Sequence, residues 1–303
     1  MFKKLKNPNP TPIWISDFFY PIFKGGAEMC DYAAKQYFAS KGLQIETRGT
    51  DQVSVDWLNF NKKRPFIFSN FVNINPACVV WLAEHPEVNY IIYEHDHKYC
   101  KYRNPRQHGI QCLCNCHSRN SPIIKMIKGA KKILCQSLMH QNIISLNIAE
   151  KNKVISLGCN VWSFEEEAKL EQIAITNKER KPEYIVLKSS NPIKNQDGCL
   201  AYANNYNIQT KVLPPCSWES LLDAFTEYQG FIFLSLVAEN ARVVVEARIA
   251  GCDVITNDLI GHRHEAWWHN ASRTEIVQVA KNAKEKLYLE TKDFLQGVYD
   301  GRY

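Results

Sequence analysis

Short apolar runs alternate with amphipathic stretches along most of the chain. The apolar runs are four to seven residues long, the length of a buried strand, and the stretches between them carry hydrophobic residues at helical spacing. Gly42 and Gly251 each follow such a stretch and mark the end of a helix. This alternation predicts an α/β fold with parallel sheets. The predicted strands cover residues 13–16, 43–47, 65–71, 89–93, 132–135, 154–158, 184–187, 231–236 and 253–256.

A charged segment, 165–182, divides the predicted strands into two groups. It begins with three consecutive glutamates and ends in Lys-Pro, and it is expected to be helical and then irregular. At 303 residues the chain exceeds the usual size of one domain, so two domains of about 150 residues each are expected. The predicted helices include 26–40, 75–84, 123–129, 140–146, 218–228 and a closing helix over about 274–287.

The stretch 231–258 is the most informative segment. Its first strand ends in a polar turn with Glu239, Asn240 and Arg242, and the helix that follows carries Glu246. In parallel sheets ligands bind outside the carboxyl ends of the strands, so both glutamates stand where a ligand would lie. Carboxylates there are costly unless they contact something. The alternative is a helix with one buried and one solvated carboxylate.

Two other strand ends carry groups suited to an anion. Gly25 and Gly26 stand between the first strand and its helix, where backbone amides and the helix N-terminus can meet a negative ligand. Lys188 and Lys194 flank the turn after the strand 184–187 and can hold a diphosphate as point charges. Two solvated lysines in a surface turn are the alternative.

A dense polar cluster, Glu-His-Asp-His-Lys-Tyr, follows the predicted strand 89–93. An unbroken row of titratable groups at the carboxyl end of a buried strand indicates a site. His95 and His97 are its candidate functional residues. A histidine in a turn is otherwise most often a surface residue.

These motifs, in this order, resemble the retaining family 4 of GT-B-fold glycosyltransferases. The matching segments are 25–28, 94–97, 188–194 and 239–255. The resemblance implies two Rossmann-like domains facing a cleft, an acceptor-side domain over 1–160 and a nucleotide-sugar domain over 161–289. A tail, about 290–303, would pack back on the first domain. Two departures are a six-residue gap between Glu239 and Glu246, where the family usually has seven, and Lys188 where the family usually has arginine.

The resemblance also assigns a role to each position. Glu246 is expected to accept a hydrogen bond from the ribose, and Glu239 to orient sugar hydroxyls. His95, ahead of His97, is expected to face the donor sugar. The predicted catalytic residues are His95, Glu239 and Lys194. The predicted donor-binding residues are Gly25, Gly26, Lys188, Lys194, Asn240, Ala241, Arg242 and Glu246.

A nucleotide sugar, with a UDP-sugar expected, is therefore the implied donor, and retention at the anomeric carbon is the implied outcome. Lysines and backbone amides can stabilise the leaving diphosphate, so no catalytic metal is expected. No well-placed carboxylate nucleophile is evident, so we expect front-face attack in which the departing phosphate takes the acceptor proton. A phosphorylase or an epimerase on the same fold is an alternative.

The net charge of +6 is modest, but its distribution is uneven, since no Asp or Glu occurs from Lys98 to Ala149. Such a segment is either a solvated basic face or a footprint for a polyanion. We expect a hydroxymethylated base in DNA as the acceptor, with a glycan or lipid-linked acceptor as the alternative. A non-catalytic nucleic-acid-binding module is an alternative of another class. The predicted acceptor-binding residues are His97, Lys98, Arg103 and Arg106.

Eleven cysteines without a secretory signal indicate reduced thiols and a cytoplasmic location. No apolar run reaches the roughly 18 residues of a membrane span, although peripheral membrane contact stays open. One segment is rich in soft metal ligands, but its Cys-x-Cys-x-Cys-His spacing does not match common zinc motifs. Thiols in a loop are therefore expected there, with a structural zinc as the alternative. The ligand-type residues are Cys100, His108, Cys112, Cys114, Cys116 and His117.

Overall fold

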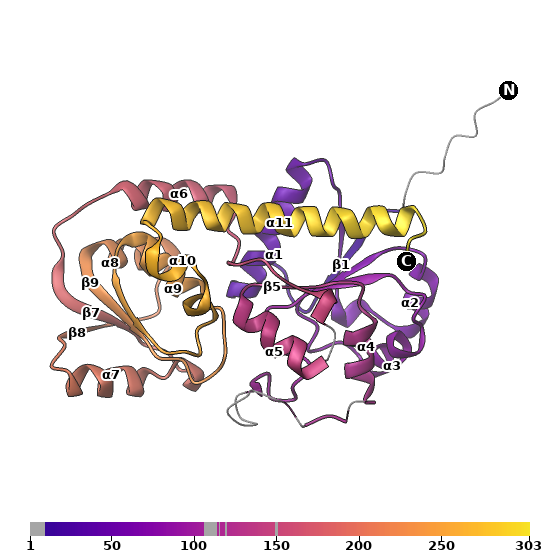
Figure 1. Ribbon diagram of the computed structural model, residues 1–303, viewed down its shortest axis with the longest axis horizontal. Helices are drawn as coiled ribbons and strands as arrows, with labels where there is room; N and C mark the ends of the chain where they lie inside the picture. The colour runs from indigo at the N-terminus through magenta and orange to yellow at the C-terminus, as the bar shows by residue number, and fades with distance from the viewer. Residues whose placement is uncertain (1–9, 106–113, 115, 119, 149–150) are drawn as a thin grey trace.

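The computed structural model describes residues 10–105, 114, 116–118, 120–148 and 151–303. The protein has two lobes, each built around one parallel sheet surrounded by helices (Figure 1). The predicted α/β class with two Rossmann-like domains is confirmed. One apolar core cluster includes Trp14 and Phe38 of the first lobe and Phe231 and Ile249 of the second, so the lobes are packed against each other.

The first lobe contains a six-stranded sheet in the order β2-β1-β3-β4-β5-β6, with all neighbours parallel. The order reverses at β1, because β2 lies on one side of it and the sheet grows from β3 on the other. Such a reversal leaves a crevice at the carboxyl ends of the two central strands, where ligands bind. The strands are β1 (Ile13–Ser16), β2 (Glu46–Gly49), β3 (Phe66–Phe68), β4 (Tyr90–Tyr93), β5 (Ile133–Cys135) and β6 (Val154–Ser156).

The helices of this lobe begin and end at residues suited to those positions. The Ser54 hydroxyl accepts from Trp57 N at 3.2 Å at the start of α2, and Asn75 Oδ1 accepts from Ala77 N at 2.9 Å at the start of α3. Gly42, with φ +81°, follows the end of α1. The elements are α1 (Gly26–Ser40), η1 (Thr50–Gln52), α2 (Val55–Asn61), α3 (Pro76–Glu84), α4 (Pro122–Gly129), α5 (Leu138–Ile148) and η3 (Lys151–Lys153).

The second lobe contains a four-stranded parallel sheet in the order β10-β9-β7-β8. Here the order reverses between β7 and β9, so the segments after these two strands flank the corresponding crevice. The strands are β7 (Lys181–Leu187), β8 (Thr210–Leu213), β9 (Tyr228–Phe233) and β10 (Asp253–Thr256). The helices are η4 (Pro192–Lys194), α7 (Gln196–Asn205), α8 (Trp218–Glu227), α9 (Arg242–Ala250), η5 (Gly261–His264) and α10 (Trp267–Asn270).

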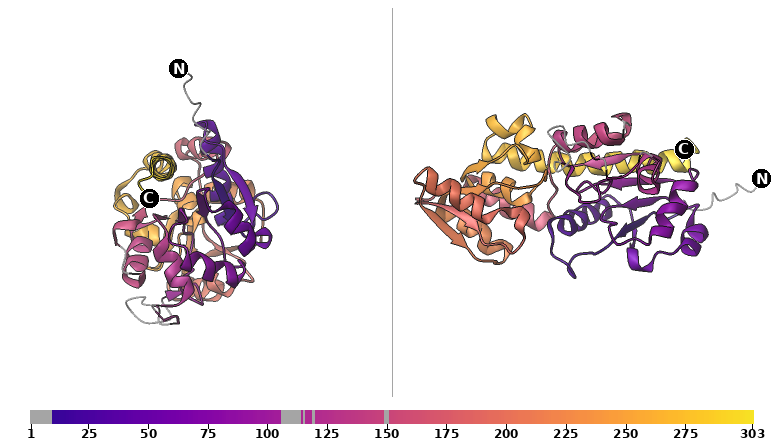
Figure 2. Two further views of the ribbon diagram at one scale, coloured as in Figure 1. Left: turned by 90° about the vertical axis from the view of Figure 1, so that its right-hand side faces the viewer. Right: turned by 90° about the horizontal axis from the view of Figure 1, so that it is seen from below.

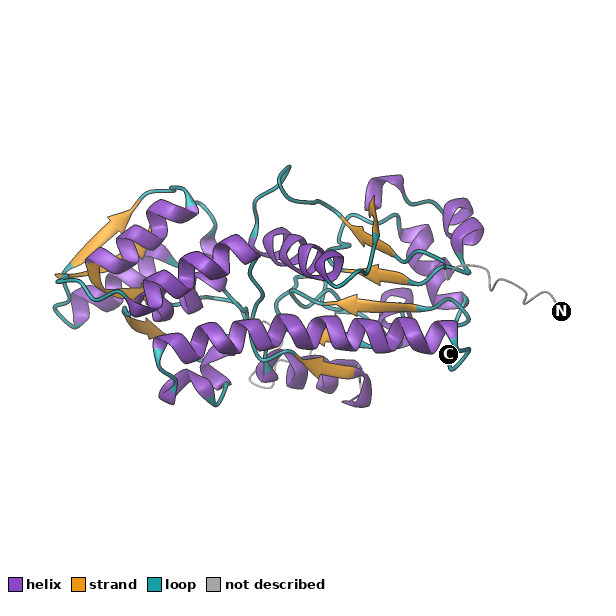
Figure 3. Cartoon of the chain, turned by 90° about the horizontal axis from the view of Figure 1, so that it is seen from above, coloured by secondary structure: helices purple, strands orange, loops and turns teal. Residues whose placement is uncertain are grey.

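Two helices connect the lobes. The helix α6 (Phe164–Ile175) follows the first sheet, and α11 (Arg273–Tyr299) returns from the second lobe along the first, as Figures 2 and 3 show. In the first lobe, Lys132 Nζ lies 2.5 Å from Glu290 Oε2 and 2.8 Å from Asp293 Oδ2. The last residues of the chain therefore lie against the first lobe.

Some element boundaries differ from the sequence predictions. The second strand begins at Glu46, not at residue 43, because Leu43 and Ile45 pack their side chains on the core before the chain joins the sheet edge. The strand predicted at 231–236 ends at Phe233, where its pairing with β10 ends. The closing helix runs twelve residues beyond the predicted 287, because Phe294 and Leu295 are buried. None of the helices in the described part of the chain is both long and apolar enough to cross a membrane.

Candidate functional site

In the second lobe, two side chains fix Glu239 in the loop after β9. Lys194 Nζ lies 2.5 Å from Glu239 Oε2, and the Ser235 hydroxyl donates to Glu239 Oε1. Lys194 also lies over the Phe233 ring, 5.2 Å from its centroid. The side chains of Lys194 and Glu239 are 29% and 17% exposed, so both remain open to a ligand. Two of the predicted catalytic residues are therefore neighbours, whereas Lys188 is exposed after β7.

Arg242, the first residue of α9, is buried between the lobes. Its Nη2 lies 2.6 Å from Glu166 Oε1, and its guanidinium lies over the Trp162 ring at 5.0 Å. Burial alone would lower the pKa of Arg242, but Glu166, Cys30 and Glu246 together outweigh it and raise that pKa. Among the described residues, Nη1 is buried and has no hydrogen-bond partner. This nitrogen is a donor available for an acceptor group.

Glu246 is buried one helical turn after Arg242. Its Oε1 accepts from Trp162 Nε1 at 2.9 Å and from Trp218 Nε1 at 3.0 Å, and lies 3.5 Å from Arg242 Nε. A ribose hydroxyl would have to use Oε2 or displace an indole. The role predicted for Glu246 stays a prediction, with its carboxylate oriented by two tryptophans.

Gly25 and Gly26 of the first lobe lie near Arg242 of the second lobe. Gly25 is the N-cap of α1, and within the described chain its helix end has no side-chain cap. A Cβ at Gly25 would meet the Glu28 carboxylate, and a Cβ at Gly26 would lie 3.9 Å from Arg242 Cδ. Backbone amides at the start of α1 therefore lie close to the side chain of Arg242, which suits binding of an anion.

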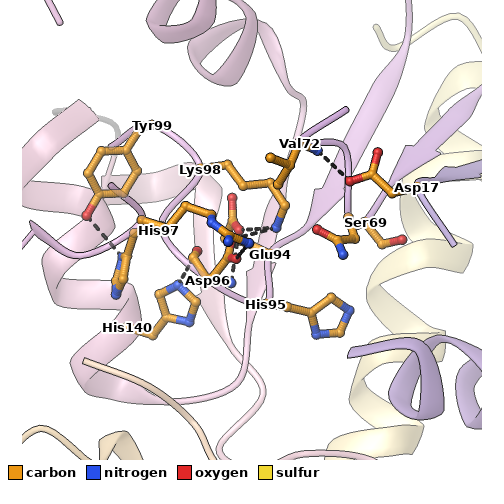
Figure 4. A network of polar contacts seen from close by, with 12 residues as sticks. Asp17, Ser69, Val72, Glu94, His95, Asp96, His97, Lys98, Tyr99 and His140 are labelled. Atoms are coloured by element: carbon orange, nitrogen blue, oxygen red, sulfur yellow. Dashed lines mark hydrogen bonds and ion pairs between the residues drawn. The ribbon is translucent and has the colours of Figure 1, made fainter. Parts of the chain in front are cut away.

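His95 does not present a free ring nitrogen. Nε2 lies 2.7 Å from Asp31 Oδ1, and Nδ1 accepts from Gln136 Nε2 at 2.9 Å. Asp31 in turn accepts from the Ser69 hydroxyl at 2.5 Å. In Figure 4 the His95 ring lies apart from the neighbouring polar cluster. Residues of α1 and the loop after β5 therefore hold the ring, and the contact with the donor sugar predicted for His95 stays a prediction.

The polar cluster itself is an internal network. Lys98 Nζ lies 2.7 Å from Glu94 Oε1 and 2.8 Å from Asp96 Oδ1 (Figure 4). Arg103 Nη1 lies 3.2 Å from Asp96 Oδ2. Burial raises the pKa of Glu94 to about 8. Burial also acts to raise the pKa of Asp96, but Lys98 and Arg103 outweigh it and lower that pKa.

Two of the predicted acceptor residues are buried in this cluster. The Lys98 side chain is only 3% exposed, so its charge is compensated inside the lobe. His97 Nδ1 accepts from the Tyr99 hydroxyl at 3.0 Å, and burial lowers the His97 pKa. Arg103 is half-exposed, and Arg106 lies outside the described residues. A cavity of about 440 Å³ between α3, α4 and this segment is lined by Phe71, Val79, Lys98, Lys101, Arg103 and Ile123.

The lobes are joined by polar contacts that the sequence patterns did not identify. His140 Nε2 donates to the Asp96 carbonyl at 2.9 Å, and its Nδ1 accepts from Asn240 Nδ2 at 3.0 Å. Glu265 Oε1 accepts from Leu138 N at 2.6 Å and so caps α5 from the other lobe. The only sequence signal for these contacts is that Asn240 and Glu265 stand in polar turns.

Three of the ligand-type cysteines come together. The Sγ atoms of Cys100, Cys114 and Cys116 all lie within 4.8 Å of one another. His117 is described but is not part of this group, and Cys112 and His108 lie outside the described residues. Of the two predictions for this segment, thiols in a loop and a structural zinc, neither is tested by the proximity of these three sulfur atoms.

No protein-family model and no curated protein matches this chain, but solved structures do. The catalytic domain of starch synthase IV from Arabidopsis thaliana, bound to ADP and acarbose, is similar with a TM-score of 0.54 and 9% identity, covering 96% of this chain and 99% of that one. The lipopolysaccharide outer core galactosyltransferase WaaB is similar with a TM-score of 0.51 and 11% identity, over 96% and 99% of the two chains. Two parallel-sheet lobes and this full-length likeness confirm the implied fold: the chain has the GT-B fold.

Proposed function

We propose that this protein is a glycosyltransferase that moves a sugar from a nucleotide sugar, expected to be a UDP-sugar, to a hydroxyl acceptor. The observation that carries the proposal is the approach of Arg242 in the second lobe to Gly26 in the first. This contact brings the first turns of α1 and α9 and a buried, unused guanidinium nitrogen to one place between the lobes. Such a place suits the diphosphate of the donor.

The loop after β9 and the nearby Lys194 would act on the leaving diphosphate and the donor sugar. Lys194 is the cation that would neutralise the leaving diphosphate, while Glu239 would orient sugar hydroxyls. Both lie beside the crevice between β7 and β9. Glu246 would accept from the ribose. Because both nitrogens of His95 bind protein groups, we give His95 a positioning role in the loop after β4.

Retention is part of the same proposal. The bond between the anomeric carbon and the diphosphate oxygen breaks, the acceptor oxygen bonds to that carbon on the same face, and the acceptor proton passes to the departing phosphate. Both Glu239 oxygens are already bound, by Lys194 and Ser235, which supports an orienting role for this carboxylate over a nucleophilic one. No step in this scheme needs another co-reactant.

For the acceptor, we propose a glycan or lipid-linked sugar ahead of DNA. The basic segment offers fewer open cations than its composition indicated, because Lys98 is paired with Glu94 and Asp96, and Lys132 with Glu290 and Asp293. Phosphate contacts to DNA require exposed lysines and arginines. The similar proteins named above, a starch synthase and a lipopolysaccharide galactosyltransferase, also have carbohydrate products by their names.

The test is release of nucleotide from a panel of UDP-, ADP- and GDP-sugars, with and without acceptors. We expect one donor to be hydrolysed slowly and transferred faster to a glycan acceptor. Lys194→Met should lower this turnover at least about tenfold, whereas Lys181→Met, which removes an exposed lysine paired with Glu227, should not. Transfer to hydroxymethylated duplex that falls steeply with salt would favour DNA. Tight nucleotide binding without any turnover would overturn the enzymatic proposal.

A further inference from the structure

The segment after β4 holds a cluster of thiols that glycosyl transfer does not use. Cys100 is buried, and Cys114 and Cys116 are partly buried beside it. Cys100 also lines the cavity of about 440 Å³ in the first lobe. We propose that these three cysteines bind a zinc ion as thiolates and that the ion fixes this segment against the cavity.

The distances between the sulfur atoms suit this ion. Zinc binds thiolates at about 2.3 Å with tetrahedral geometry, which places two bound sulfurs about 3.8 Å apart. The Sγ atoms of Cys100 and Cys116 are 3.7 Å apart, and every pair in the cluster lies within 4.8 Å. The sulfurs therefore need to move by about 1 Å or less to bind one ion. The described residues supply three sulfur ligands, and one further ligand would complete the tetrahedron.

One backbone amide is placed to orient a metal-bound sulfur. The backbone amide of Lys101 donates to Cys116 Sγ at 3.2 Å, an outer contact of the kind that orients metal ligands. Lys101 lines the adjoining cavity, whereas Lys98 and Arg103, which also line it, are paired with Glu94 and Asp96. A cluster of three thiolates and one Zn²⁺ carries a net negative charge, which Lys101 partly offsets.

Metal binding here would join parts of the chain that lie far apart in sequence. Cys100 lies in the segment after β4, beyond the polar cluster 94–99, whereas the backbone amide of Cys114 donates to Asn147 Oδ1 of α5 at 2.6 Å. A shared ion would therefore tie the segment after β4 to residues held by α5. On binding, three S–H bonds are replaced by S–Zn bonds, and the protons pass to solvent. Soft thiolates select zinc over hard cations such as Mg²⁺.

The experiment measures bound metal in the full-length chain after gel filtration in a reducing buffer. We expect one zinc ion per chain in the wild type, falling below about a tenth of that value in Cys114→Ser and Cys116→Ser. Cys216→Ser is the matched control, because Cys216 is exposed and lies in the other lobe, and it should keep its zinc. Far-ultraviolet circular dichroism checks that each variant folds.

Two measurements on the wild type keep the test decisive if a variant misfolds. Cobalt added to the metal-free chain should give thiolate charge-transfer bands and the visible bands of a tetrahedral ion. Zinc should protect Cys100, Cys114 and Cys116 from alkylation, while Cys216 reacts equally with and without zinc. Absence of zinc from a wild type incubated with excess zinc, or unchanged alkylation of the three thiols, would overturn the proposal. Neither result depends on whether the protein transfers a sugar.

Discussion

Replacing Gly26 with alanine tests whether the fold requires this glycine or whether the glycine leaves room for a ligand. Gly26 begins α1, and an added Cβ would meet only Arg242 Cδ, at the ordinary contact distance of 3.9 Å. Its φ does not lie in the left-handed region. Nothing in the fold therefore requires a glycine here, whereas a diphosphate held by the start of α1 would lie against this Cα.

We expect Gly26→Ala to increase stability and to decrease catalytic efficiency. A glycine-to-alanine change at a compatible position raises the free energy of unfolding by about 0.4–1 kcal/mol. If the added methyl group costs one charge-assisted hydrogen bond to the diphosphate, about 1.5–3 kcal/mol is lost in transition-state binding. That loss corresponds to a fall of about 10- to 150-fold in kcat/KM for the nucleotide sugar.

The assay measures urea unfolding and the initial rate of nucleotide release for each variant. Gly42→Ala is the control, because we expect it to change stability without changing activity. Gly42 follows the other end of α1 with φ +81° and open space around it, so alanine there should cost about 1 kcal/mol of stability and leave kcat/KM unchanged. The reasoning is refuted if Gly26→Ala keeps wild-type kcat/KM, or loses it only together with stability.

Three further outcomes follow from the contacts between and near the lobes. Gly261→Ala places a Cβ against Asn240 Oδ1 and the Ser137 hydroxyl, so it should lower the free energy of unfolding by about 1–3 kcal/mol; an unchanged urea midpoint would contradict this contact. Burial lowers the pKa of His140 to about 4. Below about pH 6.5 the His140 ring therefore becomes protonated in the unfolded chain but stays neutral in the folded chain. Stability should fall by up to about 3 kcal/mol between pH 6.5 and 4, and His140→Gln should flatten the curve; parallel curves for both proteins would count against it. Glu246→Gln should raise KM for the donor by about tenfold with a smaller change in kcat, whereas an unchanged KM would remove Glu246 from the ribose site.

Patterns confined to a few neighbouring residues predicted the fold well. The strands at 13–16 and 253–256 were placed correctly, because each is an apolar run bounded by polar residues. In each sheet the strand order reverses beside a turn for which the sequence predicted a site. In the second sheet this brings Lys194 and Glu239 together, although they are 45 positions apart in the sequence. Strand ends in a parallel sheet share one edge, and this is why the prediction of a shared place was available from sequence.

Contacts set by tertiary packing were not available in the same way. The sequence showed His95 in a polar row, but not that Asp31 in α1 and Gln136 after β5 would hold both ring nitrogens. Likewise, Lys132 of the basic segment appeared open until its partners Glu290 and Asp293 in α11 were known. Spacing along the chain likewise did not show that the sulfur atoms of Cys100, Cys114 and Cys116 would lie within 4.8 Å of one another.

The central claim is that both lobes hold the donor at once, and amide hydrogen exchange with and without UDP tests it most directly. We predict slower exchange in two peptides together, one covering the start of α1 at Gly25 and Gly26 and one covering the turn from Glu239 to Arg242. Protection confined to one lobe, or found only around the cavity beside Lys98 and Arg103, would contradict the account.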